Sequence, residues 1–123
     1  MKQEDKELLL KDLCARLPYG VKCKYHHIQY IENGEIIDIN RFGRVNIDGH
    51  IKDVCDIKPY LFPLSSMTEE QYEYFTQDLH AYITFNGVVG TQIALDWLNK
   101  NNFDYRGLIE KGLAIDCTNL NIY

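Results

Sequence analysis

The fold is decided by residues 21–54, VKCKYHHIQYIENGEIIDINRFGRVNIDGHIKDV. Two dipeptides in this stretch, Asn33-Gly34 and Asp48-Gly49, adopt positive φ angles at low energetic cost, as two-residue hairpin turns require. A softer turn signal, Arg41-Phe42-Gly43, lies between them. These turns predict a small antiparallel β-meander of about four short strands. The expected strands cover about residues 21–32, 35–40, 44–48 and 50–54.

The first expected strand has two chemically different faces, because side chains alternate along a strand. Val21, Cys23 and Tyr25 share one face, which we expect to pack against the core. Lys22 and Lys24 lie on the other face, which we expect to be in contact with water.

Leucine spacing predicts a helix before the sheet, over residues 5–17. Leu9, Leu13 and Leu17 recur at four-residue intervals and form its apolar stripe. Pro18-Tyr19-Gly20 follows and is expected to end the helix, because proline and glycine are poor continuations of it.

The segment after the meander, residues 56–67, is expected to be a connector laid across the core. Pro59 and Pro63 fall within it, and proline cannot donate a hydrogen bond to a sheet ladder. A central strand is therefore not expected in this segment.

A capping box, Thr68-Glu69-Glu70-Gln71, predicts a helix over about residues 69–81. Residues 82–90 leave two structures open, because their composition favours a strand while Asn86-Gly87 fits either a hairpin turn or a helix end. A last helix is expected over about residues 91–101. The residues that favour a strand are Tyr82, Thr84 and Val88.

Together these patterns predict an α+β fold, a small antiparallel β-meander packed with about three helices. The chain has 123 residues and no linker-like change of composition, so we expect residues 1–123 to form a single α+β domain. A chain of this length buries enough surface to build a core without disulfides or metals.

The formal net charge of −5 and the scattered Lys and Arg residues argue against nucleic acid binding, which needs clustered cations. A nucleic acid binder that uses the Lys22/Lys24 face remains as an alternative. No segment approaches the ~18 apolar residues of a membrane span, so we expect a cytoplasmic protein without membrane contact. Its four cysteines form no CxxC pair and are expected to be reduced and mostly buried thiols.

Candidate chemical groups are few. His26, His27, His50 and Cys55 all fall in the expected sheet, but adjacent histidines of a regular strand point to opposite faces and cannot both bind one ion. We therefore expect no catalytic residue, no metal site and no cofactor. A small hydrolase or metal-dependent enzyme that uses the His50/Cys55 region is kept as the alternative.

The best candidate for binding is the aromatic and charged segment 103–107, FDYRG. We expect Phe103, Tyr105 and Arg106 to bind a partner, because Tyr and Arg anchor interfaces through large contact areas with a directional polar end. A structural role is left open, in which Phe103 and Leu108 fill the core while Asp104 pairs locally with Arg106 or caps the next turn.

Two segments carry a resemblance to a known group of proteins. They are residues 58–70, KPYLFPLSSMTEE, and residues 96–114, DWLNKNNFDYRGLIEKGLA. Together they resemble a family of small uncharacterised proteins from gut anaerobes, often encoded by prophages or other mobile elements, with no assigned activity. The resemblance implies a mobile-element setting and nothing about a substrate.

The combined expectation is a non-catalytic accessory or protein-interaction module, associated with a mobile element. Its partner is expected to be another protein or a second copy of the chain.

Overall fold

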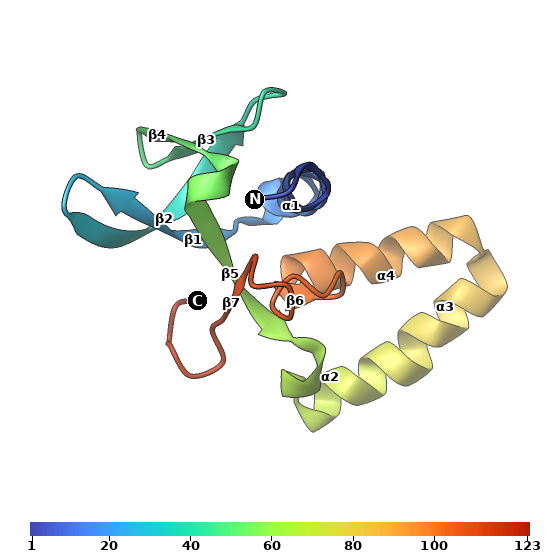
Figure 1. Ribbon diagram of the computed structural model, residues 1–123. Helices are drawn as coiled ribbons and strands as arrows, with labels where there is room; N and C mark the ends of the chain where they lie inside the picture. The colour runs from blue at the N-terminus through green and yellow to red at the C-terminus, as the bar shows by residue number, and fades with distance from the viewer.

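The computed structural model describes residues 1–81 and 83–123; the expectation for Tyr82 lies outside the described residues. The fold is α+β, as predicted (Figure 1). Helix α1 (Gln3–Arg16) packs beside a curved sheet, and a helical hairpin projects away from the sheet. Among the described residues, no helix has both the length and the apolar character needed to cross a membrane.

The sheet is larger than the predicted meander and is mixed. Its strand order is β4-β3-β2-β1-β5-β6, with β7 also paired to β5. The first five strands pair antiparallel, whereas the two short C-terminal strands join β5 in parallel. The strands are β1 (Lys22–His27), β2 (Tyr30–Ile39), β3 (Arg44–Ile47), β4 (His50–Asp53), β5 (Ile57–Pro63), β6 (Phe103–Asp104) and β7 (Ile115–Asp116).

The expected connector is in fact β5, a central strand. Pairing with β1 covers the first residues of β5 and ends at Pro59, which lies opposite Cys23. Pairing with the C-terminal strands begins at the next residue and ends at Pro63. Each proline therefore lies at the end of a paired stretch, where its missing N–H is tolerated.

The first hairpin turn is also displaced from its predicted position. Asn33 and Gly34 lie inside β2. The turn falls instead at Ile28-Gln29, directly after His26 and His27 at the end of β1. Gly34 is needed for packing, because a Cβ built on it would lie 2.6 Å from Ile47 Cγ2. The second predicted turn is confirmed, with positive φ at both Asp48 and Gly49.

The capping box is confirmed, and the helix it starts is longer than predicted. Thr68 Oγ1 accepts from the Gln71 backbone N–H at 3.2 Å, and the Thr68 N–H donates to Gln71 Oε1 at 2.9 Å. Helix α2 (Glu69–Glu73) continues through a π-helical turn (Tyr74–Asp78) into α3 (Leu79–Asn86). A break at Gly87, with φ of 55°, separates it from α4 (Val88–Lys100). Residues 82–90 thus belong to a helical hairpin and not to a strand.

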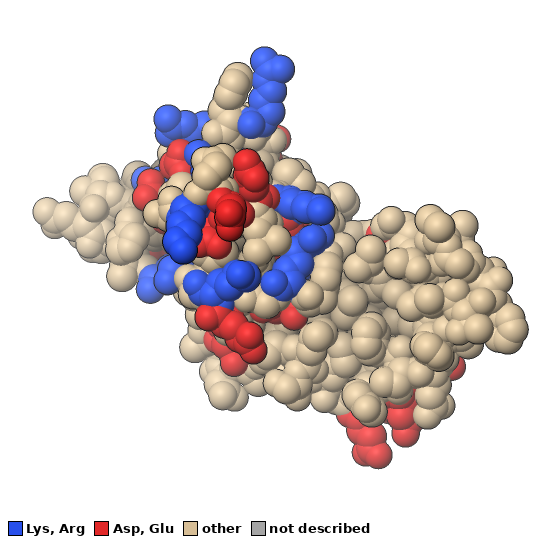
Figure 2. All heavy atoms as spheres, turned by 45° about the vertical axis from the view of Figure 1, so that its right-hand side comes forward, with Lys and Arg blue, Asp and Glu red and all other residues tan. Residues whose placement is uncertain are grey.

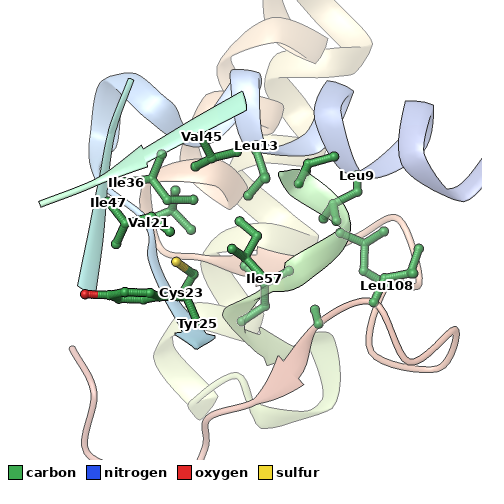
Figure 3. Close-up of a cluster of buried hydrophobic side chains, with 14 residues drawn as sticks. Leu9, Leu13, Val21, Cys23, Tyr25, Ile36, Val45, Ile47, Ile57 and Leu108 are labelled. Atoms are coloured by element: carbon green, nitrogen blue, oxygen red, sulfur yellow. The ribbon is translucent and has the colours of Figure 1, made fainter. Parts of the chain in front are cut away.

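The core lies between α1 and the concave side of the sheet (Figure 3). Leu9 and Leu13 of α1 meet the predicted face of β1, whose Cys23 and Tyr25 are buried. A second cluster joins the helical hairpin to the sheet through Trp97, whose ring centroid lies 5.6 Å from that of Phe103. The hairpin is therefore anchored at its base only, and its far end extends into solvent.

Candidate interaction surface and polar sites

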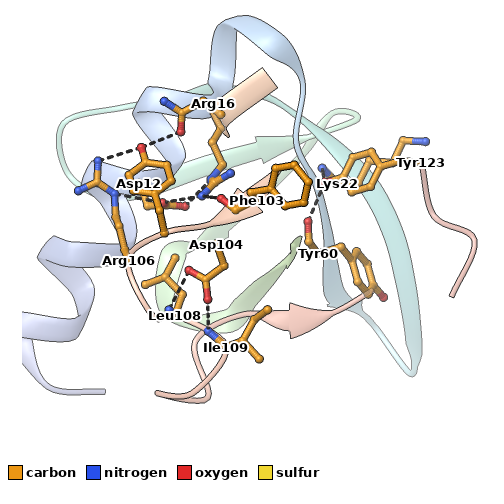
Figure 4. Close-up of polar contacts among 12 residues, drawn as sticks. Asp12, Arg16, Lys22, Tyr60, Phe103, Asp104, Arg106, Leu108, Ile109 and Tyr123 are labelled. Atoms are coloured by element: carbon orange, nitrogen blue, oxygen red, sulfur yellow. Dashed lines mark hydrogen bonds and ion pairs between the residues drawn. The ribbon is translucent and has the colours of Figure 1, made fainter. Parts of the chain in front are cut away.

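A buried carboxylate on α1, that of Asp12, binds two arginines (Figure 4). Arg16 Nε donates to Asp12 Oδ2 at 2.8 Å, and Arg16 Nη2 donates to Asp12 Oδ1 at 3.1 Å. Arg106 Nε donates to the same Oδ1 at 3.1 Å. Asp12 and Arg16 are fully buried, so the ion pair is shielded from solvent.

This ion pair also holds the segment that contains the predicted binding residues. Arg16 Nη2 donates to the Phe103 carbonyl oxygen at 2.7 Å. The guanidinium groups of Arg16 and Arg106 lie 5.3 and 5.0 Å from the centroid of the Tyr105 ring. The Tyr105 hydroxyl donates to Asn99 Oδ1 at 2.8 Å. The segment is therefore attached to both α1 and α4.

Asp104 caps the turn that follows it. Its Oδ1 accepts from the Leu108 N–H at 3.0 Å, and its Oδ2 accepts from the Ile109 N–H at 2.9 Å. Asp104 is buried, so these two bonds compensate its desolvation. The ion-pair partner of Arg106 is accordingly Asp12 and not its neighbour Asp104.

The structure brings Phe103, Tyr105 and Arg106 together, and each contacts other parts of the same chain. Phe103 is 3% exposed and packs in the core beside Trp97. Tyr105 and Arg106 are half-buried and keep part of their surface in solvent. Their contacts attach the C-terminal segment to α1, and the Arg106–Asp12 pair takes the place of the local Asp104–Arg106 pair considered from the sequence.

The histidines of the sheet meet in a pair that sequence spacing did not reveal. The His27 and His50 ring centroids lie 4.1 Å apart, and the His50 ring lies 5.8 Å from that of Tyr25. Cys55 lies beyond the opposite end of β4, which separates it from His50 by on the order of 10 Å of extended chain. Among the described residues, no three His, Cys, Asp or Glu side chains form a group that could hold a metal ion.

Cys55 instead borders an open hollow of about 840 Å³ with His26 and Asp56. Three lysines complete its charged lining, and two of them, Lys24 and Lys58, lie directly opposite each other in the β1–β5 ladder. Desolvation and the nearby Asp53 carboxylate raise the pKa of the Cys55 thiol, which keeps it protonated at neutral pH.

Lys22 is not free to bind a phosphate, whereas Lys24, on the same face of β1, lines the open hollow. The Lys22 Nζ donates to the Ile122 carbonyl oxygen at 3.0 Å and lies 5.7 Å from the Tyr123 ring centroid. The predicted Lys22/Lys24 face is therefore divided between a structural contact with the C-terminal segment and the open hollow.

Only two of the four cysteines, Cys23 and Cys117, are buried, whereas Cys14 and Cys55 are exposed. Burial raises the pKa of Cys23 to about 12 and that of Cys117 to about 11. Both thiols are thus neutral at physiological pH, and all four cysteines are free, as expected from the sequence.

Several highly exposed apolar side chains lie at the far end of the helical hairpin. Phe85, Val88 and Val89 are 84%, 86% and 65% exposed. Figure 2 shows this part of the surface, on the right, as a nearly continuous area without Lys or Arg. The sequence explains why, because residues 79–95 contain no Asp, Glu, Lys or Arg.

A hollow lies beside this apolar tip, along α3 and the π-helical turn that precedes it. It encloses about 470 Å³ and is lined by Tyr74, Asp78, Ala81, Phe85 and Asn86. The small side chain at Ala81 leaves space one helical turn before the exposed ring of Phe85. The α3 face therefore carries both a projecting ring and a depression.

Sequence reasoning missed this surface, although a signal for it was present. The charge-free stretch was visible in the sequence, but residues 82–90 were compatible with a buried strand, in which such composition is ordinary. Only the helical hairpin places these apolar residues in solvent.

Comparison with known proteins finds no matching family model, no similar curated protein and no similar solved structure.

Proposed function

We propose that this protein is a non-catalytic accessory module that acts through protein interaction. Its docking surface is the outer face of the α3–α4 hairpin, and its partner is a second copy of the same chain. The observation that carries the proposal is the exposure of Phe85, Val88 and Val89 within residues 79–95, a stretch without formal charge. Contiguous exposed apolar surface of this kind is typical of interaction sites.

Burial of this surface would supply the driving force. Complete burial of one Phe or Val side chain contributes roughly 1.5–3 kcal/mol, and a two-fold interface buries each of them twice. The rest of the chain carries the net charge of −5, so two copies repel each other over most other approaches. At the uncharged tip of the hairpin two copies can approach each other without this electrostatic repulsion.

The α3 face is suited to pair with itself. A two-fold interface needs one patch that complements its own copy. Phe85 projects from this face, and the hollow at Ala81 lies on the same face one turn away. In an antiparallel pair of α3 helices, the Phe85 ring of each copy enters the hollow at Ala81 of the other.

The same register gives Asp78, the one charged residue of the hollow, a favourable position. It places Asp78 opposite Val88 of the second copy, which is the first residue of α4. The free N–H groups at a helix N-terminus favour a nearby carboxylate. The charge thus fits the antiparallel arrangement, whereas a parallel pair brings the two Asp78 carboxylates together.

Light scattering across a concentration series tests this proposal. We expect the wild-type chain to reach twice its monomer mass at high concentration, and Phe85→Asp to remain monomeric. Ile28→Asp is the matched control, because Ile28 is also 84% exposed but lies in the β1–β2 turn. A wild-type monomer at every concentration would overturn self-docking and leave the hairpin to an unrelated protein. Dimerisation lost in Ile28→Asp and kept in Phe85→Asp would place the contact elsewhere.

The proposed setting is the cytoplasm of a cell that carries the gene on a mobile element. This part rests on the resemblance of residues 58–70 and 96–114. If the genes on either side of this one in the genome are chromosomal housekeeping genes, the mobile-element setting is contradicted.

A further inference from the structure

An unpaired edge of the sheet lies along the first half of β2, away from the proposed docking surface. Strand β2 pairs with β1 over residues 30–35, but β3 pairs with it only from Ile36 onward. Residues 30–33 are all exposed, and the β1–β2 hairpin that contains them projects from the sheet, on the left in Figure 1. This hairpin therefore presents one strand edge to solvent.

The direction of the backbone groups at this edge follows from the antiparallel ladder, in which alternate residues bond to the same neighbour. The Ile36 N–H donates to the Val21 carbonyl at 2.9 Å, so the even-numbered residues of β2 in this stretch bond to β1. Ile31 and Asn33 direct their N–H and C=O groups to the opposite side. No strand of the described residues pairs with them there, which leaves two donors and two acceptors open.

The sequence of this edge does not protect it from pairing. Natural sheets protect their edges with Lys, Pro, bulges or a covering element. Residues 30–34, YIENG, contain no Lys, Arg or Pro, whereas β4, at the end of the sheet, carries Lys52. Tyr30 and Ile31 are 67% and 58% exposed and lie on opposite faces of the strand. Open backbone groups flanked by apolar side chains are what an added strand uses.

Three carboxylates give this edge a negative charge. Glu32, Glu35 and Asp48 are exposed, and none of them forms an ion pair among the described residues. The Glu35 N–H donates to Asp48 Oδ2 at 3.3 Å, which ends the open part of the edge. Lys22 lies opposite Glu35 in β1, but its ammonium group is held by a C-terminal carbonyl oxygen. A strand with Lys or Arg complements this edge, whereas a second copy would bring the same carboxylates together.

We propose that the open edge of β2 binds an extended segment of a different protein that carries Lys or Arg, and that this segment joins the sheet as an antiparallel strand. Its N–H groups donate to the Ile31 and Asn33 carbonyls, and its carbonyls accept from the N–H groups of the same two residues. A basic side chain lies opposite Glu32, and apolar side chains lie opposite Tyr30 and Ile31. This surface is separate from the α3–α4 hairpin, so its failure leaves self-association untouched.

The peptide acetyl-Lys-Thr-Lys-Val-Val-amide is the probe. Set antiparallel against residues 34–30, it places its second lysine opposite Glu32 and its two valines opposite Ile31 and Tyr30. Titration into the 15N-labelled protein, followed by 1H–15N NMR, reports binding residue by residue. We expect a millimolar Kd, because a peptide of this size has a small total binding energy. The resonance shifts should centre on residues 30–35.

Two N-methylated peptides separate strand addition from non-specific attraction. In the antiparallel register the N–H of the first valine points at the Ile31 carbonyl, whereas that of the second valine points away from β2. Methylation of the first valine nitrogen should weaken binding by at least about fivefold, and methylation of the second should change the Kd by less than about twofold. The acidic peptide acetyl-Glu-Thr-Glu-Val-Val-amide should bind at least about fivefold more weakly than the basic one.

Two variants of the protein test the charge and the location. Glu32→Gln keeps an oxygen that accepts from the Tyr25 hydroxyl but removes the charge, and it should weaken the basic peptide by about threefold. Glu110→Gln is the matched control, since Glu110 is exposed and lies outside the sheet. Phe85→Asp should bind the peptide as the wild type does, because Phe85 lies in the α3–α4 hairpin.

Four results would overturn the proposal. They are no shift at residues 30–35 with the basic peptide at millimolar concentration, equal effects of the two N-methyl groups, equal binding of the acidic and basic peptides, and equal effects of Glu32→Gln and Glu110→Gln. Shifts of residues 30–33 that depend on the concentration of peptide-free Phe85→Asp protein would assign the edge to a second copy and overturn it as well.

Discussion

Among single residues, Asp12 has the strongest electrostatic contacts in the molecule. Its carboxylate is fully buried and shared between Arg16, also fully buried, and Arg106, which is partly exposed. A buried ion pair contributes little net stability by itself, but removal of one partner leaves an uncompensated charge in the interior. The two arginines therefore differ in how much they depend on Asp12.

We expect Asp12→Asn to lower the free energy of unfolding by about 3 kcal/mol, because Arg16 stays buried without its counterion. Arg106→Gln should cost only about 1 kcal/mol, since that side chain reaches solvent. Urea denaturation with Glu110→Gln as the exposed control measures both differences. An Asp12→Asn protein within 0.5 kcal/mol of the wild type would contradict the buried network.

From the raised pKa values of two buried thiols we predict a loss of stability at alkaline pH. The pKa values of Cys23 and Cys117 are raised in the folded state to about 12 and about 11. Above the ordinary thiol pKa the unfolded chain releases these protons while the folded chain retains them. The contribution of the two thiols to the free energy of unfolding is therefore fully present below that pKa and is lost as the pH rises past it.

Between pH 8 and pH 10 the free energy of unfolding should fall by about 3 kcal/mol. The measurement is urea denaturation under reducing conditions at both pH values. Cys23→Ala should show roughly half of this decrease, because one of the two titrating thiols is gone. A stability that is equal at pH 8 and pH 10 in the wild type would show that these thiols ionise as readily in the folded state.

The residue types of 103–106 were recognisable in the sequence, but their partners were not. Tyr and Arg anchor contacts inside a protein by the same chemistry that anchors an interface. Arg106 pairs with Asp12, which is 94 positions away in the chain. No local pattern connects two residues at that distance, so the choice between an external and an internal partner could not be made from sequence.

At the scale of elements, local patterns gave the correct result where one short signal acts alone. The capping box at Thr68 and the turn at Asp48-Gly49 are examples, because each depends only on neighbouring residues. Asn33-Gly34 has the same turn preference, yet β2 runs through it. At this position packing against β3 outweighs the turn preference, because Gly34 allows the close approach of Ile47.

This explanation predicts that Gly34→Ala is destabilising by about 2 kcal/mol, because its Cβ would lie 2.6 Å from Ile47 Cγ2 and 2.7 Å from Asp48 Oδ2. Gly49→Ala is the comparison, since a Cβ there meets nothing within 4 Å and only the positive φ opposes it. Thermal denaturation of both variants gives the difference. If Gly49→Ala proves the more harmful, packing against β3 is not what requires Gly34.

The hairpin and β5 show why other elements escaped prediction. Residues 82–90 have a composition that suits a strand, but the helix that begins at Glu69 continues to Asn86 and α4 begins at Val88. Pro59 and Pro63 argued against a strand, but whether a proline is tolerated depends on where pairing with neighbours begins and ends. That information belongs to strands far apart in sequence.

At the scale of the whole molecule, the chain has two chemically different regions. The sheet and α1 carry the charged surface and the buried ion pair, whereas the hairpin projects from them with an uncharged, apolar tip (Figures 1 and 2). The α+β class followed from sequence patterns. The docking surface did not, because it depends on how one element projects from the rest.

The central claim is that the α3 face docks against its own copy, and isotope-filtered NOE spectroscopy tests it most directly. An equimolar mixture of 13C-labelled and unlabelled protein, at a concentration where light scattering detects association, reports only contacts between copies. The account predicts cross-peaks between the Phe85 ring of one copy and the Ala81 methyl group of the other. Intermolecular cross-peaks that involve only other surfaces, such as the Ile28 turn, would contradict it. The absence of any intermolecular cross-peak would contradict it as well.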